Sequence, residues 1–245
     1  MKKLIILCLF ALLTACGKET ALPEMNESTI AQNTPCDTED RPEYYDAYAE
    51  IGPEEDVQYS VSEFSRGFDP DDPLQVAQFS NAIALVHVIS IDGGDNRIET
   101  LGTYSLPYTK GKMEILKVFH GEIPEGETLE YRRMGGTLTF SQYLEGQPEA
   151  SRKKMLSLMK TPPAYVSWKS AGDIDIEAGK TYLAYLTHPD YTLENVWYIV
   201  GEAGGLRELD VERYIVPDVS DLSALRVRNN YTDSWEELVS VPGLD

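Results

Sequence analysis

Short apolar runs separated by turn residues are the feature that most restricts how this chain can fold. Beyond about residue 74 the runs have the length of β-strands, and clusters of Gly, Pro, Asp and Asn divide them. We predict strands at residues 82–91, 109–121, 128–134, 137–143, 181–187, 196–202 and 212–216. Residues 61–245 are therefore expected to form one all-β (β-rich) domain, most simply a small closed barrel with one or two peripheral helices.

Two of these predictions depend on particular patterns. Residues 82–91, AIALVHVISI, form a continuous apolar run, which favours a strand that is covered on both faces. The turn-forming residues 92–96 follow this run and are expected to end the strand. Gly135-Gly136 lies between residues 128–134 and 137–143, which indicates a β-hairpin.

Two segments have helical patterns instead. Asp72-Pro73 precedes the segment LQVAQFSN, with Asp72 as the expected N-cap and Pro73 at the first helical position. Residues 148–160, PEASRKKMLSLMK, begin with a proline and carry Met and Leu on one side. We expect a short helix at each place.

The N-terminal residues 1–15 have the layout of an export signal. Two lysines precede the apolar residues 4–13, a stretch shorter than the roughly 20 residues that span a bilayer. The ending Leu13-Thr14-Ala15-Cys16 resembles that of a bacterial lipoprotein signal. This resemblance implies cleavage before Cys16 and acylation of its thiol, palmitate being such a lipid, which anchors the protein in the cell membrane on its extracytoplasmic face. The alternative is an ordinary signal peptide with a chance cysteine.

Residues 16–60 have the composition of an acidic linker between this anchor and the domain. The whole chain has a formal net charge of −20. Because binding to phosphates requires a basic surface, nucleic acid is disfavoured as a partner. Tyr44, Tyr45 and Tyr48 depart from the composition of a linker, and they would dock either on the domain or on a partner.

The order of the predicted elements resembles a known family. A helix precedes AIALVHV, MEILKVFHG, GETLEYR, EAGKTYLAYL and VWYIVGEAGG. Over about residues 80–216 this order is similar to netrin-like modules and to the inhibitory domain of tissue inhibitors of metalloproteinases, and the chain also resembles lipoproteins of Firmicutes. The resemblance implies an OB-like barrel. Protease inhibition is not implied, because that family uses a disulfide-tied N-terminal cysteine, whereas Cys16 is predicted to be lipidated.

One polar cluster is a candidate cation site. Asp92, Asp95 and Asn96 place side-chain oxygens in a predicted turn, although turn formation alone explains these residue types. The three histidines lack the short spacing of a metal-binding set, and the chain has no Gly-x-Ser-x-Gly segment. Asp173 and Asp175 alternate along a segment that we interpret as a solvated strand face. We predict no catalytic residue and no cofactor.

Aromatic residues indicate a binding surface. The chain has 15 Tyr and 3 Trp, and Tyr143, Tyr165, Trp168 and Tyr191 lie at predicted strand ends or in loops. Because Tyr and Trp favour contacts with proteins and glycans, these four are candidate binding residues. We expect a non-catalytic, lipid-anchored module that binds an envelope protein or a glycan. The alternative is an envelope hydrolase that acts on wall polymers or peptides.

Overall fold

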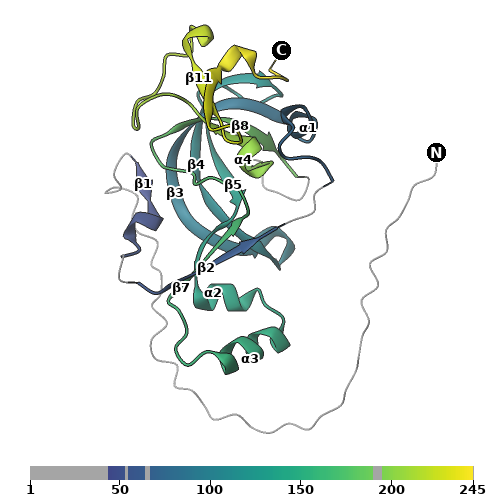
Figure 1. Cartoon of the computed structure of the whole chain (residues 1–245), viewed down its shortest axis with the longest axis vertical. Helices are drawn as coiled ribbons and strands as arrows, with labels where there is room; N and C mark the ends of the chain where they lie inside the picture. The colour runs from purple at the N-terminus through teal and green to yellow at the C-terminus, as the bar shows by residue number, and fades with distance from the viewer. Residues whose placement is uncertain (1–43, 53–54, 64–66, 190–194, 245) are drawn as a thin grey trace, which may run out of the picture. The chain divides into compact units, whose positions relative to one another are not determined.

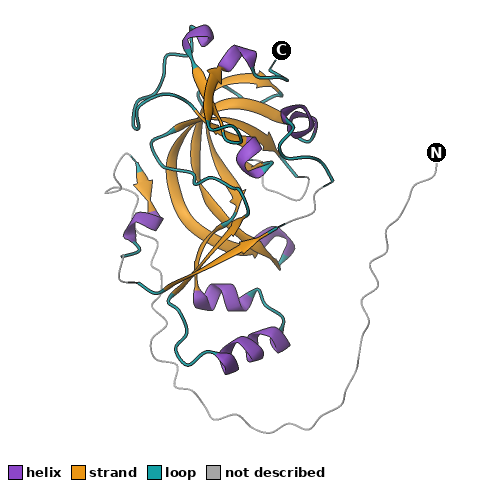
Figure 2. Ribbon diagram, in the orientation of Figure 1, coloured by secondary structure: helices purple, strands orange, loops and turns teal. Residues whose placement is uncertain are grey.

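The computed structural model describes residues 44–52, 55–63, 67–189 and 195–244, which belong to one compact unit (Figure 1). The predicted signal, Cys16 and Tyr191 lie outside the described residues, so the predictions made for them stay predictions. Strands predominate and helices are few, which confirms the β-rich fold class (Figure 2). In the described part of the chain, no helix is long and apolar enough to cross a bilayer.

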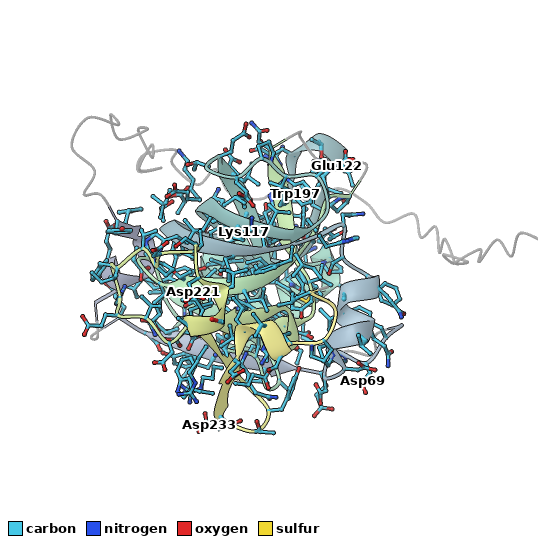
Figure 3. The ribbon with its side chains drawn as sticks, turned by 90° about the horizontal axis from the view of Figure 1, so that it is seen from above. Asp69, Lys117, Glu122, Trp197, Asp221 and Asp233 are labelled. Carbon is cyan, nitrogen blue, oxygen red and sulfur yellow. The ribbon has the colours of Figure 1, made fainter. Side chains whose placement is uncertain are left out.

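The elements follow one another as β-strands with short helices between them. Charged side chains such as Asp69, Glu122 and Asp233 lie around the outside (Figure 3). The strands are β1 (Tyr45–Asp46), β2 (Val57–Ser62), β3 (Ala82–Ile98), β4 (Thr103–His120), β5 (Thr128–Met134), β6 (Gly136–Thr139), β7 (Tyr165–Ser170), β8 (Thr181–Thr187), β9 (Val196–Ile199), β10 (Leu206–Glu208), β11 (Arg226–Asn229) and β12 (Ser234–Glu237). The α-helices are α1 (Pro73–Gln78), α2 (Phe140–Glu145), α3 (Glu149–Leu158) and α4 (Glu202–Gly205). The 3₁₀-helices are η1 (Ala47–Glu50), η2 (Glu99–Leu101), η3 (Leu222–Ala224) and η4 (Leu238–Ser240).

The long strands form a mixed sheet in which part of the pairing runs in a ring. β3 pairs antiparallel with β4, and β4 pairs antiparallel with β5. β5 pairs in parallel with β9, β9 is antiparallel to β8, and β8 pairs back to β3. β1 and β10 extend this sheet from β3 and from β8. We refer to β3, β4, β5, β9 and β8 as the ring strands.

Packing on both faces explains why residues 82–91 have no polar face. Because successive side chains of a strand point to opposite sides, Ala84 and Val86 enter a core to which every ring strand contributes. Ile83 and Leu85 enter a second core, formed with α1 and the C-terminal segment. The prediction of a strand that is covered twice is confirmed.

β3 does not end at Asp92, so the predicted turn is wrong. The strand continues through the predicted turn and pairs with β4, which itself begins earlier than predicted. The register shifts in this part of the pairing, and such irregularities bend and twist a strand. A Cβ on Gly94 would lie 2.2 Å from the carbonyl oxygen of Thr137, so glycine at this position allows β6 to approach β3.

The predicted hairpin across Gly135-Gly136 is also wrong. β5 stays in the ring, whereas β6 pairs with β7 in a separate three-stranded sheet of order β2-β7-β6. Gly135 has a φ of +93°, which glycine adopts without strain, and the chain turns here from one sheet to the other. β6 is short because Thr139 forms a capping box with Gln142 and begins α2.

Both predicted helices are confirmed, but a late strand is not. Asp72 caps α1, and Pro73 is its first residue. α3 lies within residues 148–160, although none of its residues is buried. Residues 212–216 form turns and irregular structure, because Tyr214 has a φ of +70°, outside the range of extended backbone.

The fold begins before residue 61, inside the segment that the sequence assigns to the linker. β1 pairs in parallel with β3, and β2 pairs in parallel with β7. Tyr48 packs against the main core, and the Tyr44 hydroxyl lies 3.0 Å from Nε2 of His87. Of the two alternatives for the tyrosine cluster, the structure shows docking on the domain.

Candidate functional site

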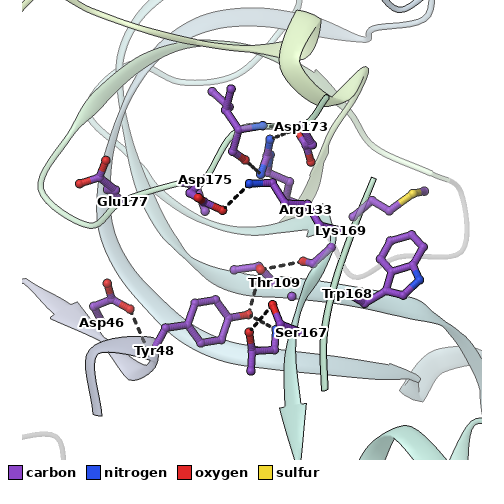
Figure 4. Close-up of a pocket in the computed structure, with 16 residues that line it drawn as sticks. Asp46, Tyr48, Thr109, Arg133, Ser167, Trp168, Lys169, Asp173, Asp175 and Glu177 are labelled. Carbon is purple, nitrogen blue, oxygen red and sulfur yellow. Dashed lines mark hydrogen bonds and ion pairs between the residues drawn. The ribbon is translucent and has the colours of Figure 1, made fainter. Parts of the chain in front are cut away.

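A cavity of about 270 Å³ opens where the ring sheet, the three-stranded sheet and residues 44–52 meet (Figure 4). Thr109 of β4 and Arg133 of β5 reach it from the ring strands. Ser167 and Trp168 of β7 line it from the small sheet, and Tyr48 of η1 lines it from the N-terminal side. We call this cavity the junction pocket.

Hydroxyl groups form one wall of the junction pocket (Figure 4). The Thr109 hydroxyl donates to the Gly135 carbonyl at 2.7 Å, so it accepts the hydrogen bond that Tyr48 donates at 2.9 Å. The Tyr48 oxygen also accepts from the Thr137 amide at 3.2 Å, and the Thr137 hydroxyl donates to Ser167 at 3.1 Å. Burial raises the pKa of the Tyr48 hydroxyl, which therefore stays protonated at neutral pH.

A buried ion pair forms the opposite wall. The Arg133 guanidinium binds the Asp173 carboxylate, and the two side chains are only 7% and 1% exposed. Arg133 also donates to the Ile174 carbonyl at 2.7 Å, and Asp173 accepts from the Ile174 amide at 2.9 Å. Burial raises the pKa of the Asp173 carboxyl, and Arg133 opposes that rise. The Nε of Arg133 has no hydrogen-bond partner among the described residues.

The solvated strand face predicted for Asp173 and Asp175 is therefore wrong. Both residues lie in an irregular segment between β7 and β8. Asp173 is buried against Arg133, whereas Asp175 is exposed and lies 2.8 Å from Nζ of Lys169. The spacing of the two carboxylates does not reveal that Asp173 pairs with Arg133, which lies 40 residues before Asp173 in the sequence.

The remaining carboxylates at the pocket have their own partners. Glu177 binds Lys180 at 2.7 Å and Arg213 at 3.5 Å, and Asp46 accepts from the Tyr48 amide at 2.9 Å. The charges in the lining are thus largely matched by neighbouring groups of the protein. The junction pocket presents polar atoms and little unmatched charge.

A second cavity, of about 520 Å³, continues from the junction pocket along the small sheet. It shares Tyr48, Thr137 and Ser167 with the pocket, and extends past Val57 and Tyr59 of β2. The two cavities together provide room for a ligand larger than the pocket alone can hold.

The structure brings one of the predicted binding residues to this site. Trp168 is buried and lines the junction pocket. Tyr165, at the start of β7, and Tyr143, on α2, are half-buried and lie outside the lining of both cavities. Tyr191 lies outside the described residues.

Tyr48, Thr109, Arg133 and Asp173 were not predicted as site residues. They come from four separate segments of the chain, so no local motif joins them. The one signal in the sequence is the tyrosine cluster, which includes Tyr48 and departs from the composition of a linker.

The predicted cation site does not lie in a turn. Asp95 Oδ1 accepts from the amides of Asn96 and Arg97 at 2.8 and 3.0 Å, and its Oδ2 lies 3.1 Å from Nζ of Lys110. The Asn96 side chain donates to a carbonyl of α2, and Asp92 lies in β3. No group of three or more His, Cys, Asp or Glu suited to a metal ion occurs in the described part of the chain. The cation site stays a prediction from the sequence.

Comparisons with known proteins identify no relative of this chain: no family model matches it, and no curated protein or solved structure matches it significantly. The chemistry of the junction pocket is therefore the basis on which a ligand can be inferred.

Proposed function

We propose that this protein is a lipid-anchored, non-catalytic binding module of the cell envelope that holds a neutral, polyhydroxylated ligand, a glycan, in the junction pocket. One observation carries the proposal: a cavity lined by Tyr48, Thr109, Thr137 and Ser167 hydroxyls beside Trp168, with the charges of its lining largely matched. The hydroxyls of Tyr48, Thr109 and Thr137 already donate within the protein, so towards a ligand they act as acceptors. The Ser167 hydroxyl accepts from Thr137 and keeps its own proton to donate, so the wall offers both kinds of partner to a ligand rich in hydroxyl groups.

The arrangement of the strands supports an OB-like closed barrel. Five ring strands pair in the order β3-β4-β5-β9-β8 and back to β3, with the single parallel pair between β5 and β9. OB barrels are five-stranded and bind oligonucleotides or oligosaccharides on their second and third strands. β4 and β5 take those places here. Thr109 and Arg133 reach the junction pocket from the inner side of these strands, the side that carries Met113 and Tyr131 into the core, so the analogy supports the barrel and not the position of the ligand.

Charge and size favour a neutral sugar among these ligands. A chain of net charge −20 would repel an oligonucleotide. A volume of about 270 Å³ is close to the lower limit of ordinary ligand pockets and suits one sugar unit, and the adjoining cavity gives room for a neighbouring unit.

Binding of isolated wall polysaccharide and its soluble fragments to the purified protein tests the proposal. Tyr48→Phe removes one pocket hydroxyl and should weaken binding by about three- to tenfold, as expected for one hydrogen bond. Tyr165→Phe, which lies outside the lining, should bind like the wild type. Thermal unfolding of each variant separates a loss of affinity from a loss of fold.

Two results would contradict this proposal. Absence of binding to any fragment, or an equal effect of the two variants, would remove the junction pocket as the glycan site. The appearance of new reducing ends during incubation would favour the alternative of an envelope hydrolase.

The proposed anchoring gives a separate prediction. Cys16→Ala removes the thiol that carries the lipid, so we expect either an uncut precursor or protein released from the membrane fraction. Cell fractionation followed by mass measurement checks this. The lipid anchor would be refuted by a mature-sized Cys16→Ala protein that still needs detergent for extraction.

A further inference from the structure

β2 is an edge strand with exposed apolar side chains. It pairs with β7 on one side, and the described residues place no strand on its other side. Tyr59 and Val61, which share one face of β2, are 79% and 68% exposed. Exposed backbone groups and exposed apolar side chains therefore occur together on one short strand.

The polar backbone groups of alternate residues face the open side of β2. The carbonyls of Asp56 and Ser62 accept hydrogen bonds from the amides of Ala164 and Ala171, at the two ends of β7. The backbone amides and carbonyls of successive residues point alternately to the two sides of a strand. Those of residues 57, 59 and 61 therefore point to the open side.

None of the usual protections of an edge strand is present in β2. Its sequence, VQYSVS, has no charged residue and no proline, and its pairing with β7 runs without a register shift. Natural edge strands commonly carry a lysine, a proline or a bulge that prevents pairing with another chain. β2 is thus suited to accept a further strand.

We propose that the open edge of β2 pairs antiparallel with β2 of a second copy of this chain, with Tyr59 on the two-fold axis. The pattern Val57-x-Tyr59-x-Val61 reads the same in both directions. In this register Val57 lies opposite Val61 of the second copy, and Tyr59 lies opposite Tyr59 of the second copy. Aromatic and β-branched pairs across strands are favourable. The backbone amides and carbonyls of residues 57, 59 and 61 all form hydrogen bonds with the second copy in this register. A self-complementary contact of this kind forms a closed two-fold dimer.

The charges and the size of this contact indicate a weak dimer. The paired segment is uncharged, but Glu55 and Glu63 lie at its two ends, and each would face the other in the second copy. The net charge of −20 on each chain adds repulsion, which salt screens. One strand per copy is also much smaller than the roughly 20–30 residues per side of a standard interface. Dimerisation should therefore strengthen as salt concentration rises.

Disulfide trapping in cells that express the full chain tests the proposal. In a Cys36→Ser background, Tyr59→Cys should yield a disulfide-linked dimer, because directly opposed residues of a hydrogen-bonded pair have Cα atoms about 5.5 Å apart, within disulfide range. Leu158→Cys, on α3 and 74% exposed, serves as the control for random collision and should yield little dimer. Adding Val57→Lys and Val61→Lys should reduce the Tyr59→Cys dimer at least fivefold, because lysines would then face each other.

The following results would overturn the proposal. Equal trapping of Tyr59→Cys and Leu158→Cys, or trapping that the two lysines leave unchanged, would mean that copies collide without pairing through β2. A disulfide-linked product of another mass would mean that a different polypeptide occupies the edge. The exposed Tyr59 side chain makes few contacts, so unchanged thermal unfolding of Tyr59→Cys shows that the fold is intact.

Discussion

Deletion of residues 17–56 should destabilise the domain by several kcal/mol, whereas deletion of residues 17–40 should cost less than about 1 kcal/mol. The longer deletion removes β1 from β3, and it removes Tyr48 from the main core. It also exposes His87, which is buried beside Tyr44. Loss of one partly buried aromatic side chain and its hydrogen bonds already costs about 2–3 kcal/mol.

The sequence alone gives a different expectation for this deletion. Residues 17–56 have few branched apolar residues, so their composition predicts a loss of less than about 1 kcal/mol for the whole segment. Urea unfolding of both truncated proteins, followed by circular dichroism, decides between the two. Equal midpoints for the two deletions would show that residues 41–56 do not stabilise the domain.

Asp173→Asn should destabilise the protein by about 3–5 kcal/mol, because it leaves the buried Arg133 guanidinium without its counter-charge. Asp175→Asn is the matched control. Its carboxylate is 84% exposed and pairs with Lys169, and an exposed pair contributes at most about 1 kcal/mol. The two substitutions are chemically identical and two residues apart, so they isolate the effect of burial.

Urea unfolding of the two variants at neutral pH measures this difference. The opposite order of effects, or two equal losses below about 1 kcal/mol, would contradict the buried ion pair. Arg133→Met combined with Asp173→Leu removes both charges and should recover much of the stability that Asp173→Asn loses.

Those parts of the fold that depend on local pattern could be predicted from the sequence. The apolar run of residues 82–91 gave a buried strand, and Asp72-Pro73 gave the start of α1. The predictions failed where pairing between distant segments decides the structure. Residues 92–96 are turn-forming types, yet pairing with β4 keeps them extended. Gly135-Gly136 does mark the place where the chain passes from one sheet to the other, but a glycine pair does not say which strand pairs with which.

The candidate site was less predictable than the fold. Trp168 was found because of its residue type, and its position on β7 brings it to the junction pocket. Arg133 and Asp173 were missed, because an ion pair across 40 residues leaves no pattern in either segment. Tyr48 was noticed only as an unusual residue in an acidic segment. Its contact with Thr109, 61 residues away, exists only in the folded chain.

Amide chemical shifts of the purified protein, recorded during titration with the wall oligosaccharide that binds most tightly, test the central claim most directly. The proposal predicts saturable shifts for residues 135–137 and 167–169, which line the junction pocket, and none for α3. Shifts confined to the outer face, where Arg132 stacks over the Tyr108 ring at 5.0 Å, would place the ligand elsewhere and contradict the junction pocket as the binding site.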